Sequence, residues 1–215
     1  MNTVGGEPYA GVGRVPSPAE LADRAAIYAV LVAHCRGVDR ADERALKSAY
    51  WSDATVEYGG FNGNAHAFCE LLPGAIRFYA YTHHAIGNVA IDIRGNAARV
   101  ETYVTAAHYR RASSTDSVAA RPPPRTAPTA VPGGDTEMVF YGRYLDRFEK
   151  RGDVWKIVHR RVVMDWNRHT AAAMVESGPP VDGLARGGRH PADPLYEHLF
   201  AAESDDAATE RRRPE

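Results

Sequence analysis

Three positions in the sequence carry side chains that could do acid–base chemistry. Asp39 follows the first predicted helix, where an ionised side chain near a chain turn is usually a solvated or capping residue. His83 and His84 are adjacent in a predicted strand, so their side chains point to opposite faces and only one can face the interior. Arg160 lies on an otherwise apolar strand face, as a pocket cation or as part of a buried or intersubunit salt bridge. Each residue alone is compatible with a structural role.

Motifs for metal or cofactor binding are missing from the sequence. The chain has 9 histidines, but no HExxH, no CxxC and no two-histidine facial triad at recognisable spacing. The glycine-rich N-terminal segment is not followed by a strand–loop–helix phosphate cradle, and there is no nucleophile elbow. We therefore expect neither a metal nor an organic cofactor.

The composition is that of an ordinary globular protein, with 25% charged and 44% hydrophobic residues and a net charge of -1. Basic and acidic residues are interleaved, so we expect neither nucleic acid nor a membrane as partner. Cys35 and Cys69 fit buried thiols, which favours a reducing compartment. Residues 1–16 do not resemble a secretory signal, and the apolar stretch 25–33 is too short to span a bilayer. The expected location is the cytoplasm.

Helices are predicted in the N-terminal part of the chain. The sequence Ser17-Pro18-Ala19-Glu20 is a capping box, and Gly37 offers a stop that places Asp39 just past the helix. The predicted apolar face of this helix comprises Leu21, Tyr28, Leu31, Val32 and Cys35. A second short helix is predicted over residues 42–50. A third begins at Asn64 as its cap, and Pro73 is expected to kink or end it.

Strands are predicted to follow the helices. Residues 54–58 form a first strand, and from residue 81 onwards the hydrophobic period becomes that of strands. Residues 85–93 and 98–109 are separated by a turn at Arg94-Gly95-Asn96, and residues 138–149 and 154–166 form a second hairpin. Helices followed by antiparallel strands predict an α+β fold, in which a curved sheet buries one face against the helices.

The chain is predicted to hold one domain, over residues 17–168, with irregular tails at 1–16 and 169–215. Residues 112–135 are rich in proline and cannot form a strand; their composition favours a flexible insertion over a functional flap. Within the C-terminal tail, residues 194–200 are expected to add one helical turn.

Three sets of residues resemble a known family. They are Gly37-Val38-Asp39-Arg40, Thr82-His83-His84-Ala85-Ile86-Gly87-Asn88, and residues 142–144 together with residues 155–160. These segments resemble the SnoaL-like branch of the nuclear transport factor 2-like superfamily, which includes scytalone dehydratase, bile acid 7α-dehydratase and hexachlorocyclohexane dehydrochlorinase. The resemblance covers residues 17–166 apart from the proline-rich insertion. It implies a cone in which a curved antiparallel sheet wraps three helices around an apolar small-molecule pocket.

The resemblance also implies an activity, namely a cofactor-independent lyase, such as a dehydratase, that acts on a hydrophobic small molecule. The family's lyases use a histidine base oriented by an aspartate, and the matching positions are His84 and Asp39. Arg160 matches a basic residue on the last strand. Where those lyases carry a tyrosine or lysine, one helical turn before Asp39, this chain has His34, which could donate a proton to a leaving group.

Two other functions fit the same fold. An isomerase or polyketide cyclase-like enzyme would use the same base, and a non-catalytic small-molecule-binding protein would need no base at all. Contact between Asp39 and His84 would favour catalysis, and a separation of the two would favour binding. A homo-oligomer is expected, because the named relatives imply a trimer, whereas other branches of the superfamily form dimers.

Overall fold

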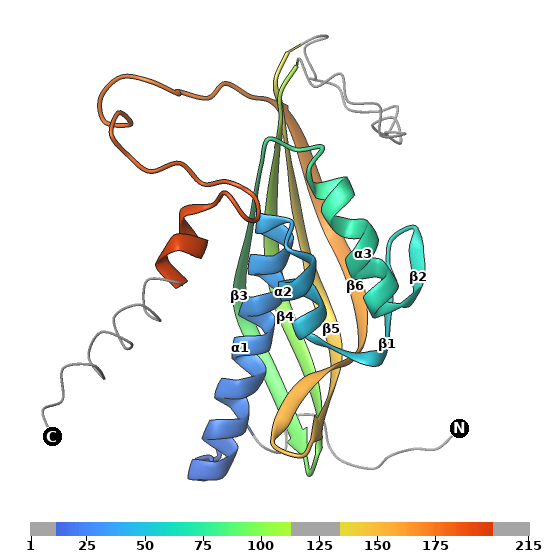
Figure 1. The fold of residues 1–215 in the computed structure, drawn as a ribbon. Coiled ribbons are helices and arrows are strands. Elements are labelled where there is room, and N and C mark those ends of the chain that lie inside the picture. The colour runs from blue at the N-terminus through green and yellow to red at the C-terminus, as the bar shows by residue number, and fades with distance from the viewer. Residues whose placement is uncertain (1–11, 113–133, 200–215) are drawn as a thin grey trace, which may run out of the picture.

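The computed structural model describes residues 12–112 and 134–199 of the chain. Three helices, α1 (Pro18–Arg40), α2 (Glu43–Ser48) and α3 (Ala65–Ile76), lie against one face of a long curved sheet (Figure 1). The sheet is built from β1 (Tyr50–Tyr58), β2 (Phe61–Asn64), β3 (Tyr81–Arg94), β4 (Ala97–Arg110), β5 (Thr136–Arg151) and β6 (Val154–Ala171). The predicted α+β fold class is confirmed.

The strand order in the sheet is β2-β1-β6-β5-β4-β3. Both predicted hairpins are present, and their turns contain Gly95 and Gly152 with φ values of 59° and 62°. A residue with a side chain rarely adopts this backbone conformation, which explains glycine at both turns. Two features were not predicted: the short strand β2, and the parallel pairing of β1 with β6, which places residues 50–57 beside residues 157–161.

The predicted end of the first helix is wrong. Ser17 caps α1 as expected, but the helix runs past Gly37 to Arg40, and Ala41 with φ 48° follows it. Gly37 serves a different purpose, because a Cβ atom there would lie 2.8 Å from the backbone nitrogen of Leu46 in α2. Asp39 is consequently in the last turn of the helix and not beyond it.

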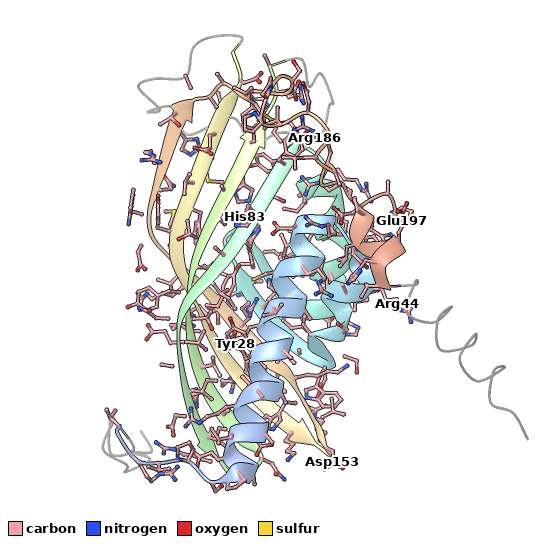
Figure 2. All side chains as sticks on the ribbon, turned by 90° about the vertical axis from the view of Figure 1, so that its left-hand side faces the viewer. Tyr28, Arg44, His83, Asp153, Arg186 and Glu197 are labelled. Carbon is pink, nitrogen blue, oxygen red and sulfur yellow. The ribbon has the colours of Figure 1, made fainter. Side chains whose placement is uncertain are left out.

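The predicted apolar face of α1 is also partly wrong. Leu31 and Cys35 are buried, but Leu21, Tyr28 and Val32 are 53%, 47% and 36% exposed; Tyr28 is labelled in Figure 2. The buried face comprises Ile27, Leu31, His34, Cys35, Gly37, Val38 and Asp39. It includes polar groups, so apolar periodicity alone did not identify it.

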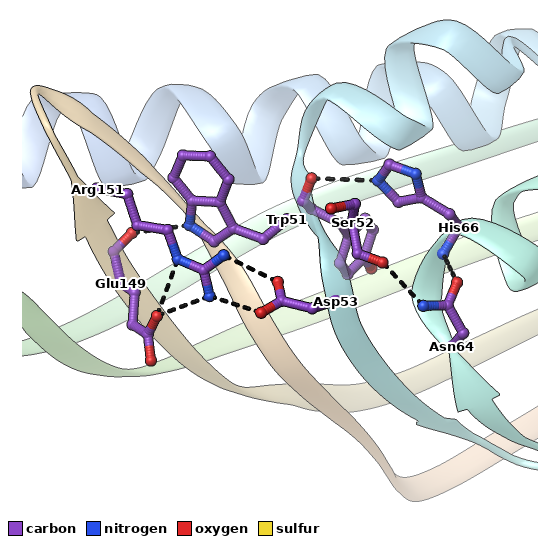
Figure 3. Close-up of polar contacts among 8 residues, drawn as sticks. Trp51, Ser52, Asp53, Asn64, His66, Glu149 and Arg151 are labelled. Atoms are coloured by element: carbon purple, nitrogen blue, oxygen red, sulfur yellow. Dashed lines mark hydrogen bonds and ion pairs between the residues drawn. The ribbon is translucent and has the colours of Figure 1, made fainter.

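The start of β1 is tied to both neighbouring elements by polar contacts (Figure 3). Arg151 of β5 forms an ion pair with Asp53, and the indole nitrogen of Trp51 donates to the backbone oxygen of Glu149. Asn64 caps α3, as predicted, by accepting from the backbone N–H of His66, and its side-chain nitrogen donates to the backbone oxygen of Ser52 in β1. These contacts hold β1 beside the end of β5 and the start of α3.

Pro73 was expected to kink or end the third helix. It lies inside α3, which continues to Ile76, so the proline does not end the helix. Strand β6 also runs further than predicted, to Ala171. A bulge at Val158 allows Ile157 and Arg160 both to face the core. Residues 194–199 are helical, which confirms the helical turn predicted there.

Among the described residues, no helix combines the length and the apolar character needed to cross a bilayer. Cys35 and Cys69 are buried free thiols, as predicted. The predicted insertion at 112–135 lies, apart from its ends, outside the described residues, as do residues 1–11 of the N-terminal tail and residues 200–215 of the C-terminal tail.

Candidate functional site

Asp39 and His84 are in direct contact inside the fold. One carboxylate oxygen, Oδ1, lies 2.7 Å from the His84 ring nitrogen Nδ1, and the other, Oδ2, accepts the backbone N–H of His84 at 2.9 Å. Both residues are 8% exposed. Because the ionised carboxylate can only accept, Nδ1 carries a proton, and Nε2 is the nitrogen left for other chemistry.

The local structure explains how the two residues meet. Asp39 is in the last turn of α1, which packs against β3. In β3 the side chains alternate, so that Thr82 and His84 are buried while His83 is exposed (Figure 2). The prediction that only one of the adjacent histidines faces the interior is confirmed.

The carboxylate of Asp39 is stabilised in its charged form. Burial raises the pKa of Asp39, but hydrogen bonds from the ring and backbone of His84, and from the hydroxyl of Thr82, outweigh it and hold the pKa below its usual value. Asp39 is therefore ionised at neutral pH. A carboxylate that accepts the Nδ1–H of an imidazole fixes the orientation and the tautomer of the ring.

His108 belongs to the same site, although the sequence analysis did not single it out. Its ring centroid lies 5.4 Å from that of His84, edge to face. Burial, and then the charge of His84, lower the pKa of His108 to about 4, so its ring is neutral at neutral pH. The signal that could have found it is the alternation along β4, where His108 shares the buried face with Val104 and Ala106.

His34 is fully buried on the face of α1 that also carries Asp39. Its Nδ1 lies 3.3 Å from the hydroxyl of Tyr50, and the rings of Tyr50 and Tyr144 contact it edge-on, each at 5.7 Å. Burial, and then the charges of Arg160 and His84, hold the pKa of His34 well below its usual value. Its Nε2 is buried and has no hydrogen-bond partner among the described residues.

Arg160 forms a buried salt bridge within the chain. Its Nε and Nη2 donate to the two carboxylate oxygens of Asp146 at 2.8 and 2.7 Å, and neither side chain is exposed. The guanidinium lies over the ring of Tyr144, with 4.0 Å between its carbon and the ring centroid. Its remaining nitrogen, Nη1, has no hydrogen-bond partner within the described part of the chain. Arg160 therefore combines a structural ion pair with a donor that is still free.

The four residues singled out from the sequence thus form two neighbouring groups. Asp39 and His84 form a hydrogen-bonded pair, while His34 and Arg160 both pack against the ring of Tyr144. The hydroxyl of Thr102, which is paired with Tyr144 across the sheet, is likewise buried without a partner in the described residues. Unpartnered buried polar atoms are rare in folded proteins, and His34, Arg160 and Thr102 each have one that the described residues leave without a hydrogen-bond partner.

The described residues contain a hollow of about 1070 Å³, and Asp146, the ion-pair partner of Arg160, is among its lining residues. Its lining includes Arg99, Arg147, His159 and Arg161 but none of the four residues above. The apolar pocket implied beside Asp39 and His84 therefore remains a prediction. Over residues 12–112 and 134–199, no group of three or more His, Cys, Asp or Glu side chains is arranged to hold a metal ion.

Comparisons with known proteins identify the family. Residues 19–161 match the SnoaL-like domain, whereas no curated protein matches the chain significantly. A candidate scytalone dehydratase from Novosphingobium aromaticivorans is 22% identical with a TM-score of 0.53, over 77% of this chain and 97% of its own. Hexachlorocyclohexane dehydrochlorinase LinA-type3 from Novosphingobium barchaimii is 20% identical with a TM-score of 0.54, over 74% and 97%.

A third solved structure, the Kfla4162 protein from Kribbella flavida, is 16% identical with a TM-score of 0.55, over 69% of this chain and 94% of its own. At these identities the likeness concerns the fold. The family match, in contrast, spans about two thirds of the sequence. The chain belongs to the SnoaL-like domain family, with the nuclear transport factor 2-like fold.

Proposed function

We propose that the protein is a cofactor-independent lyase-type enzyme, a dehydratase or a related eliminating enzyme, that acts on a hydrophobic small molecule. The observation that carries this proposal is the double hydrogen bond from His84 to Asp39. It fixes the orientation and tautomer of the imidazole, leaves Nε2 as the base and stabilises the imidazolium that proton abstraction produces. A binding protein has no need of such an arrangement.

In the proposed reaction, Nε2 of His84 takes a proton from a carbon atom of the substrate. The electron pair of the broken C–H bond forms the new double bond, and the leaving group departs with the electrons of its own bond. The free Nη1 of Arg160 is the charged donor available to stabilise negative charge that develops on the substrate. The products are the unsaturated compound and the leaving group, and the proton on His84 returns to the leaving group or to solvent.

The role of His34 in this scheme is that of a neutral donor. Burial keeps the pKa of Tyr50 above its usual value, so its hydroxyl is protonated and can donate to Nδ1 of His34. The proton of the neutral ring then resides on Nε2, which can donate a hydrogen bond to a leaving group. Because the pKa of His34 is lowered, the residue does not supply a proton as an imidazolium.

The fold relatives support elimination as the reaction type. Two of them carry the names scytalone dehydratase and hexachlorocyclohexane dehydrochlorinase, and both names describe the removal of a small molecule from a substrate. The hydrophobic pocket, the cytoplasmic location and the homo-oligomer, trimer or dimer, remain predictions for this chain. Since Asp39 and His84 are only 8% exposed, substrate entry requires some movement of the residues around them.

Isomerisation is the second candidate, and the neutral state of His34 favours it. An isomerase needs no acid for a leaving group, because the base returns the same proton to another carbon of the substrate. The ring of His108 beside His84 is neutral as well, so neither neighbouring histidine supplies a charged acid. A polyketide cyclase-like reaction would begin with the same proton abstraction.

The test is proton abstraction itself, which elimination and isomerisation share. The protein would be incubated in D₂O with a panel of ketones and β-substituted carbonyl compounds, and NMR would follow deuterium uptake and product formation. His84→Gln should slow the active reaction about a hundredfold or more, the usual contribution of a general base. Asp39→Asn should also slow it, because the charge that favours the imidazolium is lost.

The double variant should be little slower than His84→Gln alone, since Asp39 acts through His84. His83→Gln is the matched control, because His83 is the adjacent histidine on the exposed face. Wild-type rates in both single variants would contradict the proposal. Ligand binding without any exchange or turnover in the wild type would favour the binding protein.

A further inference from the structure

Arg189 contacts three segments that build the site, although it lies outside the residues that match the family. Its Nη1 donates to the backbone oxygen of Asp39 and, at 2.8 Å, to the hydroxyl of Thr82. Its Nη2 donates to the backbone oxygens of Tyr79, at 3.0 Å, and Ile76, at 3.5 Å. One guanidinium therefore contacts the end of α1, the end of α3 with the connection that follows it, and the start of β3.

The groups around Arg189 are ones that favour a cation. Helix α1 ends at Arg40 and α3 ends at Ile76, so the oxygens of Asp39 and Ile76 are carbonyls at helix C-termini. Such carbonyls lack partners within their helices and carry the negative end of the helix dipole. A planar, forked guanidinium can serve both helices at once, which a lysine ammonium cannot do with the same geometry.

The segment that carries Arg189 is attached to the end of α1 at further points. The backbone N–H of His190 donates to the oxygen of Arg40 at 2.6 Å, and the Nε of Arg40 lies 3.0 Å from Asp193. The hydroxyl of Tyr196 donates to Asp42 at 2.7 Å. Figure 1 shows this segment, in orange and red, returning from the end of β6 to the end of α1. The residues that follow Arg189 are thus attached to the end of α1 and to Asp42.

A short chain of contacts leads from Arg189 to the histidine. Arg189 donates to the Thr82 hydroxyl, and a hydrogen bond from that hydroxyl lowers the pKa of Asp39. Asp39 in turn accepts from the ring and the backbone of His84. A hydroxyl that accepts one hydrogen bond has its own proton free to donate, so Thr82 can serve both neighbours.

We propose that Arg189 is a positioning residue for the Asp39–His84 pair, acting on the backbone of Asp39 and through the hydroxyl of Thr82. The C-terminal segment at residues 188–196 is then a part of the site and not an appendage. The effect of Arg189 on catalysis rests on the proposed function, but the geometry of the Asp39–His84 pair can be measured without a substrate. Arg189 itself takes no part in the bond changes.

The test uses the full-length chain labelled with ¹⁵N. The hydrogen-bonded Nδ1–H of His84 should give a downfield proton resonance, which is assigned by its loss in His84→Gln. In Arg189→Met this resonance should be lost or displaced towards the position of an exposed imidazole. Thr82→Val should change it in the same direction, and Arg189→Lys should retain part of it. Arg186→Met is the control, since Arg186 contacts the oxygen of Glu176 and not the site.

Several outcomes would overturn the proposal. An unchanged resonance in Arg189→Met, with a native circular dichroism spectrum, would show that the pair forms without Arg189. Unfolding of Arg189→Met would show that Arg189 serves the fold as a whole, and an equal loss in Arg186→Met would show a general effect of the segment. The proposed function can fail independently: if the pair responds to Arg189 but His84→Gln keeps full activity, the positioning role stands and the base is a different residue.

Discussion

The three buried histidines of the site differ in their neighbours, and this difference separates their roles. His84 is the one in contact with a carboxylate, that of Asp39. His34 and His108 are surrounded by aromatic rings and backbone, and burial lowers the pKa of both. Because the carboxylate of Asp39 fixes the orientation and tautomer of the His84 ring, we assign the base to His84.

The lowered pKa of His108 predicts how stability depends on pH. The folded protein binds a proton at His108 only near pH 4, whereas the unfolded chain binds it near 6.5. The contribution of the neutral His108 ring to the free energy of unfolding is fully present above pH 6.5. It is lost progressively as the pH falls towards 4. The shift from 6.5 to about 4 corresponds to a contribution on the order of 3 kcal/mol.

Urea unfolding at several pH values checks this prediction. His108→Gln should lose less stability than the wild type between pH 6.5 and 4, while His83→Gln, on the exposed face, should follow the wild type. His34 contributes in the same direction, so some acid sensitivity should remain in His108→Gln. Identical pH profiles of the wild type and His108→Gln would contradict the assignment.

The ion pair of Arg160 with Asp146 predicts a large effect on folding. Arg160→Met leaves Asp146 as an uncompensated buried charge, which typically costs about 3 to 5 kcal/mol. Replacing both residues by apolar ones, as in Arg160→Met with Asp146→Leu, should restore most of the free energy of unfolding, because no buried charge is left. Denaturant unfolding measures both values.

Arg151→Met provides the comparison, since Arg151 pairs with Asp53 at the surface, where ion pairs contribute little (Figure 3). If Arg160→Met were as stable as the wild type, the ion pair would not hold in solution, and Arg160 would be available to a ligand alone. The double variant should in any case be inactive, because the free donor at Nη1 is removed with the arginine.

At the scale of the elements, the close packing of α1 on α2 depends on one glycine. A Cβ atom at position 37 would lie 2.8 Å from the backbone nitrogen and 2.9 Å from the Cγ of Leu46. Gly37→Ala should therefore destabilise the protein by about 1 to 3 kcal/mol, although alanine is the better helix former. The same change at Gly74 in α3, where a Cβ atom would meet nothing within 4 Å, should be neutral or stabilising.

Thermal and urea unfolding of the two variants would show whether their effects have opposite signs. Because Asp39 is two residues after Gly37, displacement of α1 should also disturb the contact with His84. The downfield resonance of His84 should therefore change in Gly37→Ala and stay unchanged in Gly74→Ala. Equal effects of the two substitutions would mean that α1 and α2 are less closely packed than the structure indicates.

At the scale of the whole molecule, the sequence by itself determined those features that depend on neighbouring residues. The two hairpins followed from alternating hydrophobicity and from turns that contain Gly95 and Gly152. The starts of α1 and α3 followed from the capping residues Ser17 and Asn64. Two segments that were compared with a known family contain Asp39 and His84, and these two side chains are in contact.

The tertiary structure alone decided which side of each element is buried and which distant residues meet. The hydrophobic pattern of α1 did not predict its buried face, because that face contains His34 and Asp39. The pairings of Arg160 with Asp146 and of Arg189 with Asp39 have no local signal, since their partners are 14 and 150 residues away in the sequence. The hydrophobic periodicity of a segment reflects only which of its sides faces solvent and which faces the core. A buried polar contact, in contrast, depends on where two segments that are distant in the sequence come together.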